Sequence, residues 1–217
     1  MNVHTAIRTA FRSRFARLLP ALVVALLLSI PAWAGDDVTV LIARPMVGSA
    51  GGSTTYGSTT WDQLQSARDG TAVGLEYRHS FNRRYAFQLD YDRTSTNATF
   101  QSLVSNSSVT FPVARHEISG AFIRYFGPSE SRLRPFFNVG PGILLFDGGY
   151  APGGDVGWSA SPEAVLGCGV DTPLSKHLAV RTGFRFHIFR NTNYGDSHFH
   201  AGVAHIQEPI VGLGWKF

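Results

Sequence analysis

The sequence predicts an all-β fold, an eight-stranded antiparallel up-and-down transmembrane β-barrel. Apolar and polar residues alternate with a period of two in segments of about ten residues, which is typical of strands that face lipid on one side. The connections between these segments are alternately short and long, as periplasmic turns and extracellular loops are in such barrels. Glycine recurs every few residues and no window repeats with helical periodicity, which argues against long amphipathic helices.

Residues 1–34 have the pattern of a secretory signal peptide. Four arginines and no acidic residue precede an almost wholly apolar run, Leu18–Ile30, and Ala32-Trp33-Ala34 is a small-x-small cleavage signal. The apolar run is shorter than the ~20 residues that a membrane-spanning helix needs. We therefore expect cleavage after Ala34 and a single barrel domain over residues 35–217.

The charge of the chain gives no reason to expect a nucleic-acid partner. The chain holds 19 basic and 15 acidic residues, and four of the basic ones lie in the leader, so the remainder is formally neutral at 15 against 15. The single cysteine, Cys168, cannot form a disulfide within the chain. We expect it to be a small apolar residue on a strand.

The first three strands follow from their alternation. Asp37–Gly48 is expected to be the first, although Arg44 and Pro45 interrupt both faces and leave its phase open. Thr71–His79 is the second, because valine, leucine and tyrosine alternate there with glycine, glutamate and arginine. Arg84–Ser95 is the third, where aromatic residues and leucine alternate with alanine, glutamine and aspartate.

The fourth strand is expected over Ala114–Phe126. We assign Ala121, Ile123 and Tyr125 to its lipid-facing phase and Arg124 to the other phase. The assignment rests on the apolar character of the first three residues.

Four further strands bring the number to eight, which is even, as closure of a single antiparallel chain requires. Arg134–Phe146 alternates phenylalanine, valine and isoleucine with asparagine and glycine, and Trp158–Val170 alternates small apolar residues with serine, glutamate and glycine. His177–Arg190 alternates leucine, valine and phenylalanine with arginine, glycine and histidine. Ile206–Phe217 closes the barrel with an alternation of apolar residues and glycine.

The connections support the same topology. Residues 80–83, 127–133 and 171–176 are expected to be tight turns, because they carry turn residues such as Gly127-Pro128 and Asp171-Thr172-Pro173. Residues 49–70, 96–113, 147–157 and 191–205 are longer and rich in Ser, Thr, Gly and Asn, and we expect them to be extracellular loops.

Charged residues share the phase that would face the barrel interior. An eight-stranded barrel is only wide enough for side chains to fill it, and buried charges need partners. We therefore expect a filled lumen with a network of ion pairs and no large pore. The expected members of this network are Glu76, Arg78, Asp90, Arg124, Glu163, Arg181, Arg185 and His187.

The chain ends on one apolar phase, formed by Val211, Leu213, Trp215 and the terminal Phe217. This ending resembles the closing strand of bacterial outer-membrane barrels, which the barrel-assembly machinery reads as an assembly signal. Nine aromatic residues are expected to form a girdle at the membrane interface beside the short turns. They are Tyr77, Phe81, Tyr85, Tyr125, Phe126, Phe136, Phe137, Trp215 and Phe217.

Together these features resemble the OmpA/OmpX-type family of small outer-membrane β-barrel proteins. The motifs that carry the resemblance are Gly74-Leu75-Glu76-Tyr77-Arg78, Gly120-Ala121-Phe122-Ile123-Arg124-Tyr125-Phe126, the segment Arg134–Gly142 and the terminal Gly212–Phe217. The resemblance implies an outer-membrane location in a Gram-negative-type bacterium, surrounded by lipid and lipopolysaccharide. It also implies a structural or surface-interaction role, with an unknown extracellular ligand bound through the long loops and no cofactor.

Two alternatives from other functional classes are a narrow pore and a hydrolase. The segment Arg185–Asn191 faintly resembles the His-x-Ser stretch of the outer-membrane lipid A deacylases, but Phe189 stands where the serine nucleophile would be. Ser159 or Ser197 would have to replace it, and we expect no enzyme. His198-x-His200 could suit a metal ion, but without further ligands we expect a polar loop and no metal site.

Overall fold

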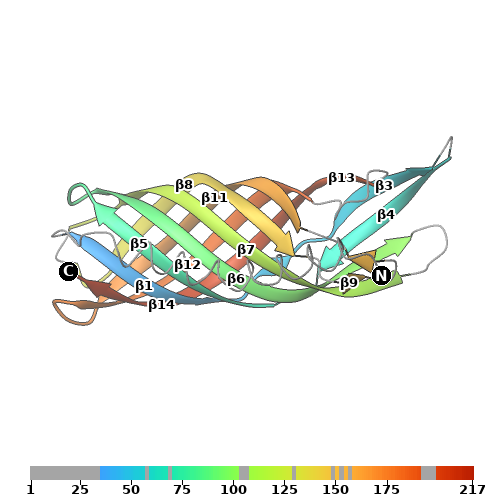
Figure 1. Cartoon of the computed structure of the whole chain (residues 1–217). Helices are drawn as coiled ribbons and strands as arrows, with labels where there is room; N and C mark the ends of the chain where they lie inside the picture. The colour runs from blue at the N-terminus through green and yellow to red at the C-terminus, as the bar shows by residue number, and fades with distance from the viewer. Residues whose placement is uncertain are drawn as a thin grey trace. The chain divides into compact units, whose positions relative to one another are not determined.

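The computed structural model describes residues 35–56, 59–67, 70–102, 108–128, 131–147, 150–151, 154–155, 158–191 and 199–217. Eight antiparallel strands close into a ring, which confirms the expected fold (Figure 1). In order around the ring these are β1 (Asp36–Ala43), β5 (Thr71–Ser80), β6 (Tyr85–Ser102), β7 (Ser108–Tyr125), β8 (Arg134–Asp147), β11 (Trp158–Pro173), β12 (Leu178–Arg190) and β14 (Val203–Lys216).

Closure occurs where the last strand meets the first. Val40 of β1 pairs with Leu75 of β5 on one side and with Leu213 of β14 on the other. The backbone N–H of Phe217 donates to the carbonyl of Asp36 at 3.0 Å. Every strand of the ring therefore has two neighbours, and the ring has no open edge.

Strands replace much of what the sequence predicted to be long loops. β6 and β7 have 18 residues each and remain paired from Tyr85↔Arg124 to Gln101↔Ser108, whereas a membrane-spanning strand needs only about 9–11 residues. Residues 49–70 contain a hairpin of β3 (Ala50–Tyr56) and β4 (Thr59–Ala67). β4 pairs with β6, and β3 pairs with the short β13 (Phe199–Ala201).

This extension is visible at one end of the barrel in Figure 1, and it corrects the prediction of loops over residues 49–70 and 96–113. Thr favours strands, but outside the membrane neither face needs to be apolar. The Ser/Thr-rich hairpin therefore lacks the alternation by which strands were recognised. Two short strands, β9 (Tyr150–Ala151) and β10 (Gly154–Asp155), pair with each other within residues 147–157.

The remaining boundaries differ by a few residues. The first expected strand is broken at Arg44 and Pro45 into β1 and the short β2 (Met46–Val47), which pairs with β14. Proline cannot donate a hydrogen bond to the sheet, which explains the break. The turn between β11 and β12 lies at residues 174–177, so Asp171 belongs to β11 and not to a turn as the sequence suggested.

The outer surface of the ring is apolar. Val40, Ile42, Val73, Val211 and Leu213 are all more than half exposed, while their strand neighbours are buried. No helix in the described part of the chain is long and apolar enough to cross a membrane.

The phase predicted for β7 is wrong. Ala121, Ile123 and Tyr125 are buried inside the ring, whereas Phe122 is exposed and the Arg124 guanidinium lies 5.4 Å from the centre of the Phe126 ring. The barrel interior beside the short turns is itself apolar, so apolar character did not identify the lipid face there.

Two of the nine expected girdle residues lie in that apolar interior. Tyr125 and Phe136 are 3% and 4% exposed and pack with Ala86 and Ile123 inside the ring. They close the turn side of the barrel instead of facing lipid. Phe81, Phe126, Phe137, Trp215 and Phe217 are exposed, as a girdle requires.

Glycines make room for long side chains inside the barrel. A Cβ atom on Gly142 would lie 2.6 Å from Oε1 of Glu163 and 2.9 Å from Cβ of Ser119. At these two contacts even a methyl group would displace its neighbours.

Candidate functional site: a charged network inside the barrel

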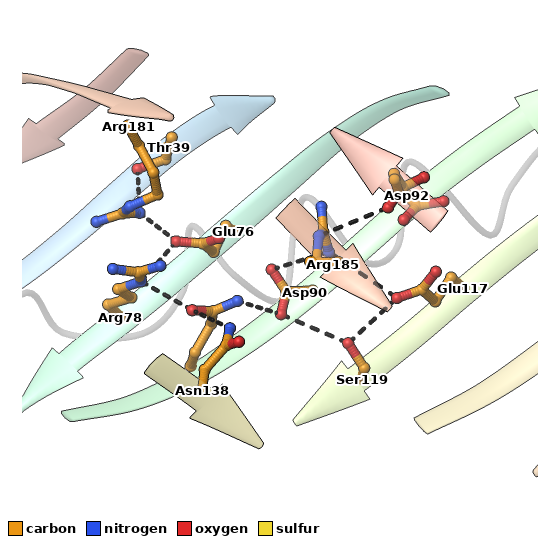
Figure 2. A network of polar contacts seen from close by, with 12 residues as sticks. Thr39, Glu76, Arg78, Asp90, Asp92, Glu117, Ser119, Asn138, Arg181 and Arg185 are labelled. Carbon is orange, nitrogen blue, oxygen red and sulfur yellow. Dashed lines mark hydrogen bonds and ion pairs between the residues drawn. The ribbon is translucent and has the colours of Figure 1, made fainter. Parts of the chain in front are cut away.

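The first part of the network, which we call the turn-side cluster, is centred on Arg181 of β12. Its guanidinium lies 2.7 Å from Oδ1 of Asp171 and 3.2 Å from Oδ1 of Asp37, and it also contacts Glu76. It donates a further hydrogen bond to Oγ1 of Thr39 at 2.7 Å (Figure 2). Three carboxylates from three strands thus share one arginine.

Arg78 completes the turn-side cluster, which comprises Asp37, Thr39, Glu76, Arg78, Asp171 and Arg181. Nε of Arg78 lies 2.7 Å from Oε1 of Glu76, and Nη1 lies 3.3 Å from Oδ2 of Asp171. The guanidinium also stacks 4.2 Å from the centre of the Phe136 ring. Arg78 therefore connects the charges to the apolar residues that close the turn side.

A polar bridge leads from Arg78 toward the middle of the barrel. Nε of Arg78 donates to Oε1 of Gln88 at 2.9 Å, and Nε2 of Gln88 donates to Oδ2 of Asp90 at 2.6 Å. Ser119 then donates weakly to both Asp90 and Glu117 at 3.4 Å (Figure 2). The two halves of the network are therefore continuous.

The second half, which we call the central cluster, comprises Asp90, Asp92, Arg115, Glu117, Glu163, Arg185, His187 and Glu208. Nη2 of Arg115 lies 3.1 Å from Oε1 of Glu208 and 3.3 Å from Oδ1 of Asp92. The nitrogens of Arg185 lie 3.6 to 3.9 Å from Asp90, Glu117 and Glu208. These distances are longer than those of good charge-assisted hydrogen bonds.

His187 lies within the central cluster and is fully buried. Its Nδ1 atom is 3.1 Å from Oε2 of Glu163 and 3.5 Å from Oε2 of Glu117, and its Nε2 atom is 3.4 Å from Oε2 of Glu208. One candidate ligand atom each from Glu117, His187 and Glu208 lies within 4.8 Å of the other two. The imidazole is thus surrounded by acceptors.

The loop side of the interior is apolar again. Phe111, Val113, Leu144, Phe146, Phe189 and Ile206 form a buried layer with Ala98 and Ala204. On β12 the order Arg181, Arg185, His187, Phe189 shows that this layer lies beyond the charges, toward the long connections. A cavity of about 40 Å³ adjoins the layer and reaches Arg115.

The structure buries seven of the eight expected network residues inside the ring: Glu76, Arg78, Asp90, Glu163, Arg181, Arg185 and His187. The prediction that Arg124 belongs to the network is wrong, because the outward phase of β7 places this residue on the exposed surface. The expected network lacked six charged members: Asp37, Asp92, Arg115, Glu117, Asp171 and Glu208.

The sequence contained a signal that three of these residues, Arg115, Glu117 and Glu208, face the interior. Arg115, Glu117 and Ser119 are polar at a period of two on β7, and Glu208 shares its phase with Gly212 and Gly214. This period would have corrected the phase of β7. The expected assembly-signal residues Val211, Leu213, Trp215 and Phe217 all face outward and are more than half exposed.

The geometry around His187 does not resemble a serine hydrolase. Ser159 lies six residues along β11 from Val165, which pairs with His187, so about 20 Å separates the two positions along the strand. Ser197 and His198 lie outside the described residues, and His200 belongs to β13. The side chains that contact His187 are acidic groups, which orient or neutralise an imidazole but do not supply the serine of such an enzyme.

Comparison with known proteins agrees with this architecture. A family model described as an outer membrane protein beta-barrel domain matches residues 21–217. OprG from Pseudomonas aeruginosa has a similar structure at a TM-score of 0.59, with 14% identity over 86% of this chain and 97% of that one. Neisserial surface protein A is similar at a TM-score of 0.56, with 16% identity over 85% of this chain and 98% of that one. No curated protein matches the sequence. The resemblance to small outer-membrane barrels is confirmed.

Proposed function

Because the chain belongs to the outer membrane protein β-barrel domain family, and so lies in the outer membrane of a Gram-negative-type bacterium, we propose that it is a closed barrel with a structural or surface-interaction role. Its interior is filled by side chains and passes no large solute. Its extended strands on the loop side face outward and carry the contacts with an extracellular partner.

The continuous charge network carries the first half of this proposal. Six of the twelve largest fully buried side chains are those of Arg78, Arg185, His187 and three glutamates, and these six occupy the space that a pore would need. Apolar layers lie on both sides of the network. An eight-stranded ring offers only enough interior for such side chains.

The length of β6 and β7 supports the second half. Each has 18 residues, and the hairpin of β3 and β4 widens the sheet beyond them. A rigid sheet outside the membrane presents surface at a lower ordering cost than a flexible loop. Lipopolysaccharide and outer-membrane lipid are its surroundings, and the unknown ligand would meet this sheet.

A narrow pore is the second candidate, because the interior carries more carboxylates than guanidinium groups. Small cations would be the solutes that such a lumen favours. A lipid A hydrolase is not favoured, because His187 faces the interior and not the lipid. We also propose that Val211, Leu213, Trp215 and Phe217 form the strand that the barrel-assembly machinery recognises.

The surface role is tested by comparing three strains in a cell-adhesion and autoaggregation assay. One lacks the protein, one produces it, and one produces a variant in which residues 51–66 are replaced by a short Gly-Ser turn. We expect adhesion or aggregation only with the full protein. Equal behaviour of all three strains, with both proteins folded in the outer membrane, would contradict the surface role.

A lipid A mass spectrum of the same strains tests the enzyme alternative. We expect an identical acylation pattern in all three. Loss of an acyl chain in the producing strain, abolished by His187→Ala in a folded barrel, would replace the proposal with a hydrolase.

A further inference from the structure

We propose that Glu117, His187 and Glu208 bind one divalent transition-metal ion, such as Zn²⁺, inside the barrel. The three residues come from β7, β12 and β14, so the ion would tie together strands that are not all neighbours in the ring. An imidazole with two carboxylates is a donor set that suits Zn²⁺ and similar ions. This site goes beyond the surface role and was not expected from the sequence.

Geometry brings the ligands together. Candidate ligand atoms of the three side chains lie within 4.8 Å of one another, and all three side chains are fully buried. Ligands at about 2.0 to 2.2 Å from a tetrahedral zinc ion stand about 3.3 to 3.6 Å apart, so the candidate atoms that are furthest apart would have to approach each other by up to about 1.5 Å.

His187 is held as a metal-ligating histidine is held. Its Nδ1 atom lies 3.1 Å from Oε2 of Glu163, to which it can donate its hydrogen. A neutral imidazole then presents a free lone pair at Nε2. Histidine ligands commonly donate their other ring N–H to a carboxylate in this way.

The atoms that face the site lack hydrogen bonds and have only long ion-pair contacts: Oε2 of Glu208 lies 3.6 Å from Nε of Arg185, and Oε2 of Glu117 lies 3.8 Å from Nη2 of Arg115. Within the described part of the chain, Nε2 of His187, Oε2 of Glu208 and Oε2 of Glu117 take part in no hydrogen bond although all are buried. Nε2 of His187 and Oε2 of Glu208 lie only 3.4 Å apart. When Nε2 carries no hydrogen, the two atoms are both acceptors, and a cation between them would satisfy both.

With its carboxylates ionised, the central cluster carries more negative than positive charge. Its members include five carboxylates, those of Asp90, Asp92, Glu117, Glu163 and Glu208, against the two guanidinium groups of Arg115 and Arg185. Three negative charges remain. Protonation of His187 would neutralise one of them, whereas a divalent ion neutralises two. Unbalanced charge is costly in a buried site.

An approach from the loop side exists at the edge of the cluster. The cavity in the apolar layer is lined by Arg115, whose guanidinium contacts Glu208 at 3.1 Å. This side chain therefore lies between the cavity and the carboxylate of Glu208.

Zn²⁺ titration of the folded protein tests the site. The protein is extracted in detergent without an affinity tag, treated with a chelator and dialysed against Zn²⁺, and bound zinc is counted by mass spectrometry. We expect one tightly bound ion per chain. His187→Gln should lower the affinity at least 100-fold, and Glu163→Gln should lower it 10- to 100-fold through the lost orientation of His187.

A variant with both His198 and His200 changed to Gln is the matched control, and it should bind as the wild type does. X-ray absorption at the zinc edge of the wild-type complex needs no variant and should show one imidazole and otherwise oxygen ligands. Absence of stoichiometric zinc in the folded wild type would mean that a protonated His187 balances the cluster alone, and would overturn the proposal. Two or more imidazoles around the ion, or unchanged affinity in folded His187→Gln, would also overturn it.

Discussion

Replacing Arg181 by Met should be among the most damaging single changes in the barrel interior. The guanidinium lies 2.7 Å from Asp171 and 3.2 Å from Asp37, and it also contacts Glu76. Methionine has a similar apolar stem but leaves these buried carboxylates without their shared partner. Removing one member of a buried ion pair typically costs 3–5 kcal/mol. We expect a loss of this size in the free energy of unfolding, because Arg78 still contacts two of the three acids.

Urea unfolding of the purified protein in detergent, followed by tryptophan fluorescence and by heat-modifiable migration in gels, measures this loss. Arg124→Met is the matched control, since Arg124 is exposed on the outside of β7 and should change stability by less than about 0.5 kcal/mol. The double variant Arg181→Met with Asp171→Asn should recover part of the loss, because it removes one stranded charge. If Arg181→Met and Arg124→Met were equally stable, the ion network would not hold the barrel together.

Three further changes test other parts of the structure. Leu89→Arg puts a charge on the outer face of β6 near the membrane midplane and should lower the stability of the barrel by about 2–4 kcal/mol. Thr110→Arg, on the extension of β7, should leave the stability unchanged. Equal heat-modifiability of the two variants would contradict the face assignment. Deletion of Phe217, whose N–H binds the carbonyl of Asp36, should reduce the folded fraction in outer membranes, and normal insertion would argue against its role in assembly. Gly142→Ala should destabilise the barrel by about 1–3 kcal/mol, because the new Cβ would lie 2.6 Å from Glu163. Gly51→Ala, with open space around it, should not change the stability. Identical unfolding midpoints of the two variants would show that Glu163 can move freely.

The barrel itself could be predicted because lipid imposes a simple rule on the strands. A residue such as Val40 or Leu213 must be apolar where it faces lipid, and the next residue must fit the interior, so the period of two survives along most of each strand. This rule fails where the membrane ends. β3 and β4 have no lipid face, and their Ser/Thr-rich sequence was therefore interpreted as a loop.

The network could be predicted in part. Glu76, Arg78, Arg181 and Arg185 lie on strands whose other phase is clearly apolar, so their inward direction followed from alternation. Arg124 was misplaced because the interior near Tyr125 and Phe136 is as apolar as the exterior. Arg181 and Asp37 lie on strands that are not adjacent, and they meet across the interior of the barrel. Such a contact depends on the registers of all the strand pairs between them, and a single sequence does not show these registers.

The same limit applies to Asp171 and Glu208. Asp171 precedes a Thr-Pro pair and was assigned to a turn, although β11 extends through Pro173 and directs the carboxylate toward Arg78 and Arg181. Glu208 lay within the expected strand Ile206–Phe217 but was not assigned to the network. The arginines that these two carboxylates meet became known only from the closed ring.

The closed interior is tested most directly by recording the purified protein in planar lipid bilayers. Buried arginines, glutamates and His187 fill the middle of the ring, and apolar layers close both sides of it. We predict no steady conductance of porin size, and at most brief, small openings. A stable porin-sized current through the folded wild-type protein would contradict the filled barrel and would make transport its leading function.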